Sequence, residues 1–192
     1  MIGLRVTGAE LALWLERSAS LYHQIAPGAQ DVDLINLDFP SFNFDVIFGL
    51  SYRIDLAQPA RFDPTGRVAN PSACRITDLR HQGVPVAADQ VFALATNSYR
   101  NGRGRGFAAT TPAQVICASP QANRDIVEAF IRAGGQAVVP AEPVWGFEPM
   151  PGTRVSFDSN PRAVGCLPEV PHLNLTPLMQ MPNGFQRFRL QL

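Results

Sequence analysis

The stretch FNFDVIFGLSYRIDLAQPARFD, residues 42–63, contains the clearest strand pattern in the chain. Within it, residues 49–56 alternate strictly between two kinds of side chain. The apolar side chains on one face are Leu50, Tyr52, Ile54 and Leu56. This alternation is typical of a β-strand with one buried face and one exposed face. The preceding residues 43–45 are interpreted as a structural turn that leads into the strand.

A helix is predicted upstream of this strand. Thr7 and Glu10 have the spacing of a capping box, in which each side chain binds the other residue's backbone N–H. Apolar residues then recur with a helical period, and they are Leu11, Trp14, Leu15, Leu21, Tyr22 and Ile25. We therefore predict an amphipathic helix that ends at Pro27 and Gly28, with Trp14 and Tyr22 in the core.

The rest of the chain predicts short strands and one further helix. The other predicted strands are residues 75–80, 91–96, 114–117, 154–157 and 185–192. Residues 91–96 are nearly all apolar, so we expect this strand to be central. Ser119 and Pro120 are expected to begin the second helix, which ends at Gly134. The proline-rich segment 159–184 is expected to be mostly loop.

These elements indicate the α+β class, with a mixed, mainly antiparallel sheet and flanking helices. A chain of 192 residues can bury a core as one domain. Its formal net charge of zero gives no long-range field that favours nucleic acid or an anionic membrane. No window reaches the roughly 18 apolar residues of a membrane span, and the N-terminus lacks the features of a signal peptide.

The cysteines and histidines lack the spacing of a metal site. Cys74, Cys117 and Cys166 are widely separated, and they form no C-x-x-C pair. Three reduced, partly buried cysteines are favoured, although one disulfide with one free thiol is an alternative. The three histidines stand in unrelated contexts and are interpreted as surface or packing residues.

Residues 94–107, LATNSYRNGRGRGF, form the candidate binding segment. A strand runs out through Asn97 to Tyr99, and glycines follow at Gly102, Gly104 and Gly106. A rigid ring at a strand end, beside a glycine loop that lets a ligand approach the backbone, can hold a flat heterocycle.

Two alternatives apply to this segment. Tyr99 can be an ordinary core residue followed by a flexible turn. The arginines around the glycines also have the pattern of an arginine/glycine RNA-binding segment. However, one short RGRG makes no basic face and the net charge is zero, so a solvated turn is favoured over RNA binding.

Six blocks of the chain, taken in order, resemble the C-terminal substrate-binding domain of the 5′-nucleotidase superfamily. The resemblance is greatest to the bacterial 2′,3′-cyclic-nucleotide 2′-phosphodiesterase/3′-nucleotidase branch. The blocks are TGAELALWLERSA at 7–19, FNFDVIFGLSYRIDLAQPARFD at 42–63, RITDLRHQGVPV at 75–86, FALATNSYR at 92–100, ICASPQANRDIV at 116–127 and WGFEPMPGTRVSFDSNP at 145–161.

The resemblance implies a two-domain, periplasmic or secreted enzyme. Its N-terminal metallophosphoesterase domain would hold two divalent metals, and its C-terminal domain would bind the nucleobase between two aromatic rings. This chain carries no metal-ligand set and no catalytic residue of that kind, so we expect it to be inactive alone. We expect residues 1–192 to be a single truncated domain that lacks its N-terminal-most segment. A loop-rich extension is expected at about 135–192.

The resemblance also implies roles for individual residues. The second ring of the base clamp maps onto Tyr99, within the pattern A-T-N-x-Y that includes Asn97. Gly102, Gly104 and Arg105 complete the predicted site. Arg105 stands where the 5′-nucleotidase branch has an acidic residue that meets the ribose hydroxyls, so that contact is not expected here. The first ring and the basic residues that steady the phosphate lie before the segment that matches residues 2–6.

The implied partners follow from these roles. They are a nucleotide or nucleoside ligand and the N-terminal metallophosphoesterase domain. A truncated sheet edge at residues 1–6 would also favour self-association. The alternative is a free-standing nucleoside- or nucleotide-binding module.

Overall fold

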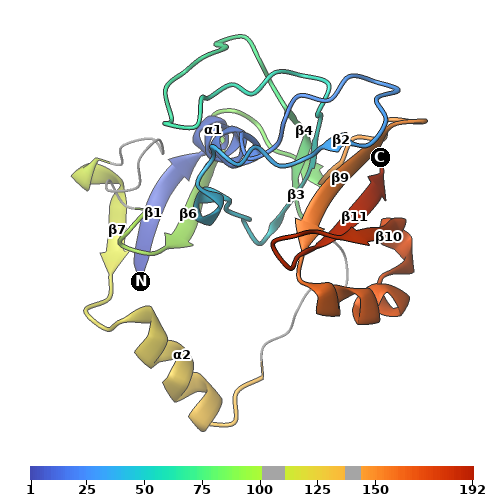
Figure 1. Cartoon of the computed structure of the whole chain (residues 1–192). Helices are drawn as coiled ribbons and strands as arrows, with labels where there is room; N and C mark the ends of the chain where they lie inside the picture. Colours follow the sequence, from blue (N-terminus) through green and yellow to red (C-terminus); the bar gives the residue numbers. More distant parts are fainter. Residues whose placement is uncertain (101–110, 137–143) are drawn as a thin grey trace.

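The computed structural model describes residues 1–100, 111–136 and 144–192 (Figure 1). Its α-helices are α1 (Gly8–Ala19) and α2 (Asn123–Arg132), and its 3-10 helices are Ser41–Asn43, Pro112–Gln114, Pro161–Glu169 and Pro171–Leu173. The first strands are β1 (Ile2–Thr7), β2 (Val32–Asp33), β3 (Leu50–Ile54), β4 (Ile76–His81), β5 (Val84–Pro85) and β6 (Val91–Thr96). The later strands are β7 (Val115–Ala118), β8 (Trp145–Phe147), β9 (Arg154–Ser159), β10 (Leu175–Gln180) and β11 (Gln186–Gln191).

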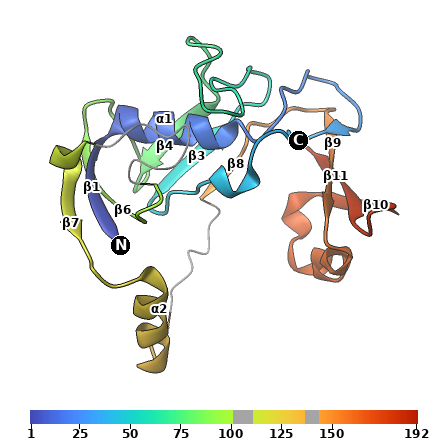
Figure 2. The same ribbon diagram turned by 60° about the vertical axis from the view of Figure 1, so that its left-hand side comes forward.

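The described strands form three sheets. Their orders are β6-β1-β7, β5-β4-β3-β8 and β10-β11-β9-β2. Most neighbours are antiparallel, whereas β3 with β8 and β2 with β9 are parallel. Both views place the first and third sheets at opposite ends of the molecule, with α1, β3 and β4 between them (Figures 1 and 2). The predicted α+β class with mainly antiparallel sheets is therefore confirmed.

Helix α1 begins as the sequence predicts and ends earlier. The Thr7 hydroxyl accepts from the Glu10 backbone N–H, and the Glu10 carboxylate accepts from the Thr7 backbone N–H at 2.7 Å. The helix stops at Ala19, so the predicted end at Pro27 is wrong. Beyond it the chain runs in strand-like pairing, in which the backbone N–H of Ile25 donates to Leu56. Tyr22 and Ile25 are buried, and they belong to this segment and not to the face of a helix.

A buried polar network joins the end of α1 to the start of β4. The Glu16 carboxylate accepts from the backbone N–H groups of Arg75 and Ile76, each at 2.7 Å. The Arg75 guanidinium donates to the carbonyls of Ala19 and Tyr22 at 2.8 and 2.7 Å. Because these carbonyls lie at and just beyond the last turn of α1, a buried cation there satisfies them. The network fixes α1 against the central sheet.

Two expectations about the first sheet are wrong. Strand β6 lies at the edge of the described sheet and pairs with β1, although its apolar run predicted a central strand. Strand β1 is the middle strand, because Ile2 pairs with both Thr96 and Ala118. The expected exposed edge at residues 1–6 is therefore absent from the described sheet, and the reason for expecting self-association there is removed.

The second helix and the C-terminal part also differ from expectation. Helix α2 begins at Asn123, a few residues after the predicted Ser119 and Pro120. The segment predicted as a loop, residues 159–184, contains two 3-10 helices and β10. The expected extension at about 135–192 therefore contributes β9, β10 and β11 to a sheet, in which β11 pairs with β9 and β9 pairs with β2 from the N-terminal half of the chain. No helix in the described ranges is long and apolar enough to cross a membrane.

Candidate functional site

Tyr99 lies on a tight turn just after the end of β6. The Asn97 side-chain oxygen accepts from the backbone N–H of Arg100 at 3.0 Å, which closes this turn. The Tyr99 residue is 47% exposed, and the Arg100 guanidinium carbon lies 5.2 Å from its ring centroid. The interpretation of Tyr99 as a core residue is therefore wrong. The role of its ring in ligand binding stays a prediction.

A cleft of about 510 Å³ opens beside the Tyr99 ring. It is lined by residues 1–2, 97–99 and 118–123. Its position follows from the register of the first sheet. Because β6 and β7 both run antiparallel to β1, their C-terminal ends lie together at the start of β1. The chain segments that leave β6 and β7 therefore form two walls of one cleft.

The described side chains of this cleft are uncharged, and they combine amide and hydroxyl groups with apolar ones. Amide groups come from Asn97, Gln121 and Asn123, and such groups both donate and accept hydrogen bonds. The Ser119 hydroxyl accepts from the Gln121 backbone N–H at 3.2 Å. An aromatic ring with amide groups nearby suits a neutral heterocycle with hydrogen-bonding edges.

The structure places only part of the predicted site. Asn97 and Tyr99 line the same cleft, as the sequence pattern indicates. Gly102, Gly104 and Arg105 lie outside the described residues. The wall at residues 118–123 was not predicted, because the sequence gives no sign that β6 and β7 flank the same strand. The sequence feature that could have pointed to this wall is the polar run that follows the strand predicted at 114–117.

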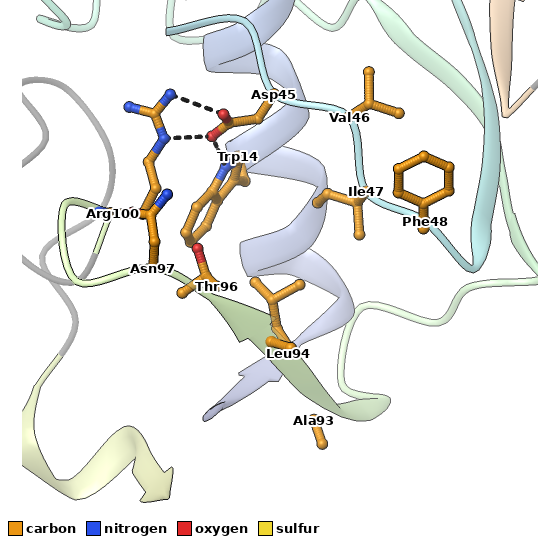
Figure 3. A pocket seen from close by; sticks show the side chains of 11 residues that line it. Trp14, Asp45, Val46, Ile47, Phe48, Ala93, Leu94, Thr96, Asn97 and Arg100 are labelled. Carbon is orange, nitrogen blue, oxygen red and sulfur yellow. Dashed lines mark hydrogen bonds and ion pairs between the residues drawn. The ribbon is translucent and has the colours of Figure 1, made fainter. Parts of the chain in front are cut away.

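A second cavity, of about 400 Å³, also borders this turn, through Asn97 and Arg100 (Figure 3). It is lined by β6, by residues 45–48 and by the side chains of Trp14 and Arg100. Arg100 is only 6% exposed and makes two contacts with the Asp45 carboxylate, Nε to Oδ2 and Nη2 to Oδ1, each at 2.8 Å. A partly buried ion pair, in which the arginine is the buried member, therefore holds the residue next to Tyr99.

No resident metal can be assigned within the described ranges. No group of three or more His, Cys, Asp or Glu side chains there could hold a metal ion. Cys74, Cys117 and Cys166 are all free and exposed, whereas partial burial was expected. The described residues therefore do not fit the two divalent metals that the resemblance implies.

Comparison with known proteins identifies the family. The family model described as 5′-nucleotidase, C-terminal domain, matches residues 1–112. The chain belongs to this family, which confirms the predicted resemblance. It is 36% identical over 170 residues to the 2′,3′-cyclic-nucleotide 2′-phosphodiesterase/3′-nucleotidase of Haemophilus influenzae, a match that covers 84% of this chain and 26% of that protein.

Other relatives have similar names. The chain is 41% identical over 135 residues to the 2′,3′-cyclic-nucleotide 2′-phosphodiesterase/3′-nucleotidase of Salmonella typhimurium, covering 69% of this chain and 21% of that protein. It is 35% identical over 158 residues to the trifunctional nucleotide phosphoesterase protein YfkN of Bacillus subtilis, covering 82% of this chain and 11% of that protein. The chain thus spans about a quarter or less of these curated relatives.

A solved structure shares the fold. It is described as a 5′-nucleotidase from Staphylococcus aureus in complex with alpha-ketoglutarate, and it aligns with a TM-score of 0.59 at 23% identity. The alignment covers 77% of this chain and 27% of that one. At this level of identity the likeness supports the fold alone.

Proposed function

We propose that this chain is the nucleotide-binding part of a longer 2′,3′-cyclic-nucleotide phosphodiesterase/3′-nucleotidase. The names of its relatives and the family match support this proposal. The nucleobase would lie in the cleft beside Tyr99, with Asn97 at its edge. A periplasmic or secreted location and a role in nucleotide breakdown are part of the proposal, and they rest on the resemblance to the family.

One observation carries the proposal of base binding. The Tyr99 ring is half exposed and borders a cleft whose described side chains are uncharged. Stacking of a base on a single aromatic ring contributes roughly 1–3 kcal/mol. Binding to one ring should therefore be weak, with a Kd on the order of millimolar, about −4 kcal/mol.

We assign the hydrolytic chemistry to the rest of the longer protein. Hydrolysis of a phosphoester in this family would use two divalent metals that activate water. The described residues bring no such ligand set together. The role proposed for this chain is to bind and orient the base and ribose. Gly102, Gly104 and Arg105 remain proposed contributors, outside the described residues.

The test is a titration of the chain, labelled with ¹⁵N, with adenosine 3′-monophosphate followed by NMR. We expect shifts at residues 97–99 and 118–123 in the wild-type chain. Tyr99→Ala should abolish these shifts. Phe185→Ala is a matched control, because Phe185 is 48% exposed and lies next to β11 at the far end of the molecule.

The melting temperature separates the two interpretations of Tyr99. Both variants should keep a nearly unchanged melting temperature, because both rings are half exposed. A structural ring would instead cost about 3–5 kcal/mol when truncated to Ala. The proposal fails if Tyr99→Ala binds the nucleotide as well as the wild-type chain does.

A further inference from the structure

The turn that carries Tyr99 is held from behind by its neighbour Arg100. The Arg100 guanidinium contacts three residues of the segment before β3. Besides its pair with Asp45, Nη1 donates to the Asn43 side-chain oxygen at 2.9 Å and Nη2 donates to the Phe42 carbonyl at 2.7 Å. The same residue closes the turn through its backbone N–H, which donates to Asn97. Arg100 therefore joins the turn to residues 42–45.

Asp45 is fixed in turn to helix α1. The indole Nε1–H of Trp14 donates to Asp45 Oδ2 at 2.8 Å, and the backbone N–H of Asp45 donates to the Ser18 hydroxyl at 3.0 Å. Figure 3 shows Trp14, Asp45 and Arg100 converging beside the end of β6. Trp14 and Ser18 belong to the buried face of α1. A continuous polar chain thus runs from the core helix to the Tyr99 turn.

Arg100 is not among the described residues that line the Tyr99 cleft. It lines the second cavity, which shares Asn97 with the Tyr99 cleft. Within the described residues, the route by which Arg100 can act on a ligand in the cleft is the Tyr99 turn, which its backbone N–H helps to close. A buried ion pair adds little net stability compared with apolar packing. The pair does hold the turn in one conformation. A ring that is already held in place loses less conformational freedom when a ligand stacks on it.

We propose that Arg100 and Asp45 are positioning residues, which hold Tyr99 in the orientation that stacks on a nucleobase. This inference rests on the proposed function of the cleft. It identifies residues 42–45, interpreted from the sequence as a structural turn, as part of the binding apparatus. The carboxylate of Asp45 connects the turn to helix α1, because it contacts both Trp14 and Arg100.

The test compares single variants of the whole 192-residue chain in the adenosine 3′-monophosphate titration. Asp45→Asn removes the charge with little change of shape, and Arg100→Lys keeps the charge and loses the planar fork. Arg75→Lys is the control, since this arginine is equally buried and binds the carbonyls of Ala19 and Tyr22 instead. The Trp14 indole N–H signal shows whether the Asp45 contact has changed.

Asp45→Asn and Arg100→Lys should each weaken binding about fivefold or more, a part of the full stacking contribution. The double variant should bind no more weakly than the weaker single variant, because the two residues act as one unit. Arg75→Lys should lose stability and keep the wild-type affinity. Measurements are made where every variant is folded, as judged by its NMR spectrum.

The outcomes distinguish this inference from the proposed function. If Asp45→Asn binds as tightly as the wild type or more tightly, positioning is refuted, since a freed Arg100 would then contact the ligand directly. If Arg75→Lys weakens binding as much as Arg100→Lys, the effect is one of stability and positioning is again refuted. If Tyr99→Ala still binds, the proposed function fails first.

Discussion

Replacement of Arg75 by Met should unfold the chain at a much lower temperature. Arg75 is 1% exposed, and its guanidinium donates to the carbonyls of Gln58, Ala19 and Tyr22. Methionine has a similar length and no donor, so three carbonyls lose a charged partner. Desolvation in this site lowers the pKa of Arg75 to about 10, and the nearby Glu16 opposes that effect.

The expected loss follows from these contacts. Three hydrogen bonds from a charged donor are worth roughly 1.5–3 kcal/mol each, and burial of the Met side chain returns roughly 1.5–3 kcal/mol. The net loss should be about 3–5 kcal/mol, the range measured when one member of a buried charged group is removed. For a chain of this size that lowers Tm by about 6–20 °C.

The assay is urea unfolding followed by circular dichroism, together with a thermal melt. Arg132→Met is the control, because the Arg132 side chain is 77% exposed and pairs only with Glu128 one turn away in the described helix. That variant should lose less than about 0.5 kcal/mol. A loss below about 1 kcal/mol for Arg75→Met would refute the reasoning that the buried guanidinium satisfies the end of α1.

Two further predictions concern ionisable side chains. Burial raises the pKa of Tyr22 and of Tyr52 above the ordinary 10.0, so the folded state holds these protons longer than the unfolded state. The stabilisation that these two protons contribute should therefore be fully present below pH 10, and the free energy of unfolding should fall as the pH rises further. Urea unfolding across that range should show a smaller fall in Tyr22→Phe. Although the Cys74 residue is exposed overall, partial desolvation of its thiol and the nearby Glu16 carboxylate raise the pKa of that thiol. Cys74 should therefore be the slowest of the three cysteines to react with iodoacetamide at neutral pH. Mass spectrometry of the labelled peptides measures the three reaction rates. Glu16→Gln should speed the reaction at Cys74. Faster labelling of Cys74 than of Cys117 would contradict the prediction.

Local features of the fold could be predicted from sequence. The capping box at Thr7 and Glu10 depends on residues three apart, and the structure contains it. The alternation at residues 49–56 likewise matches the buried face of β3. The end of α1 could not be predicted, because Tyr22 and Ile25 continue a helical period while they pack as extended chain. Which structure they adopt is decided by distant partners such as Leu34 and Leu56.

The site divides in the same way. Tyr99 stood out because an aromatic followed by a glycine loop is a local pattern. The structure leaves this residue about half exposed, and its binding role stays a prediction. The cleft wall at residues 118–123 and the pair of Arg100 with Asp45 depend on which strands meet and which loops face each other. These contacts join residues that are far apart along the chain, as Arg100 and Asp45 are, with a separation of 55 residues. No single stretch of sequence therefore predicts them.

The central place of β1 has a consequence for synthesis on the ribosome. Ile2 is made well before its two strand partners, Thr96 and Ala118. At about 5–20 residues per second, an apolar strand would wait several seconds before either neighbour emerges. Val32 of β2 waits longer still for Val155. During that interval Leu4 and Val6, which end almost fully buried, are available to chaperones that bind extended apolar segments.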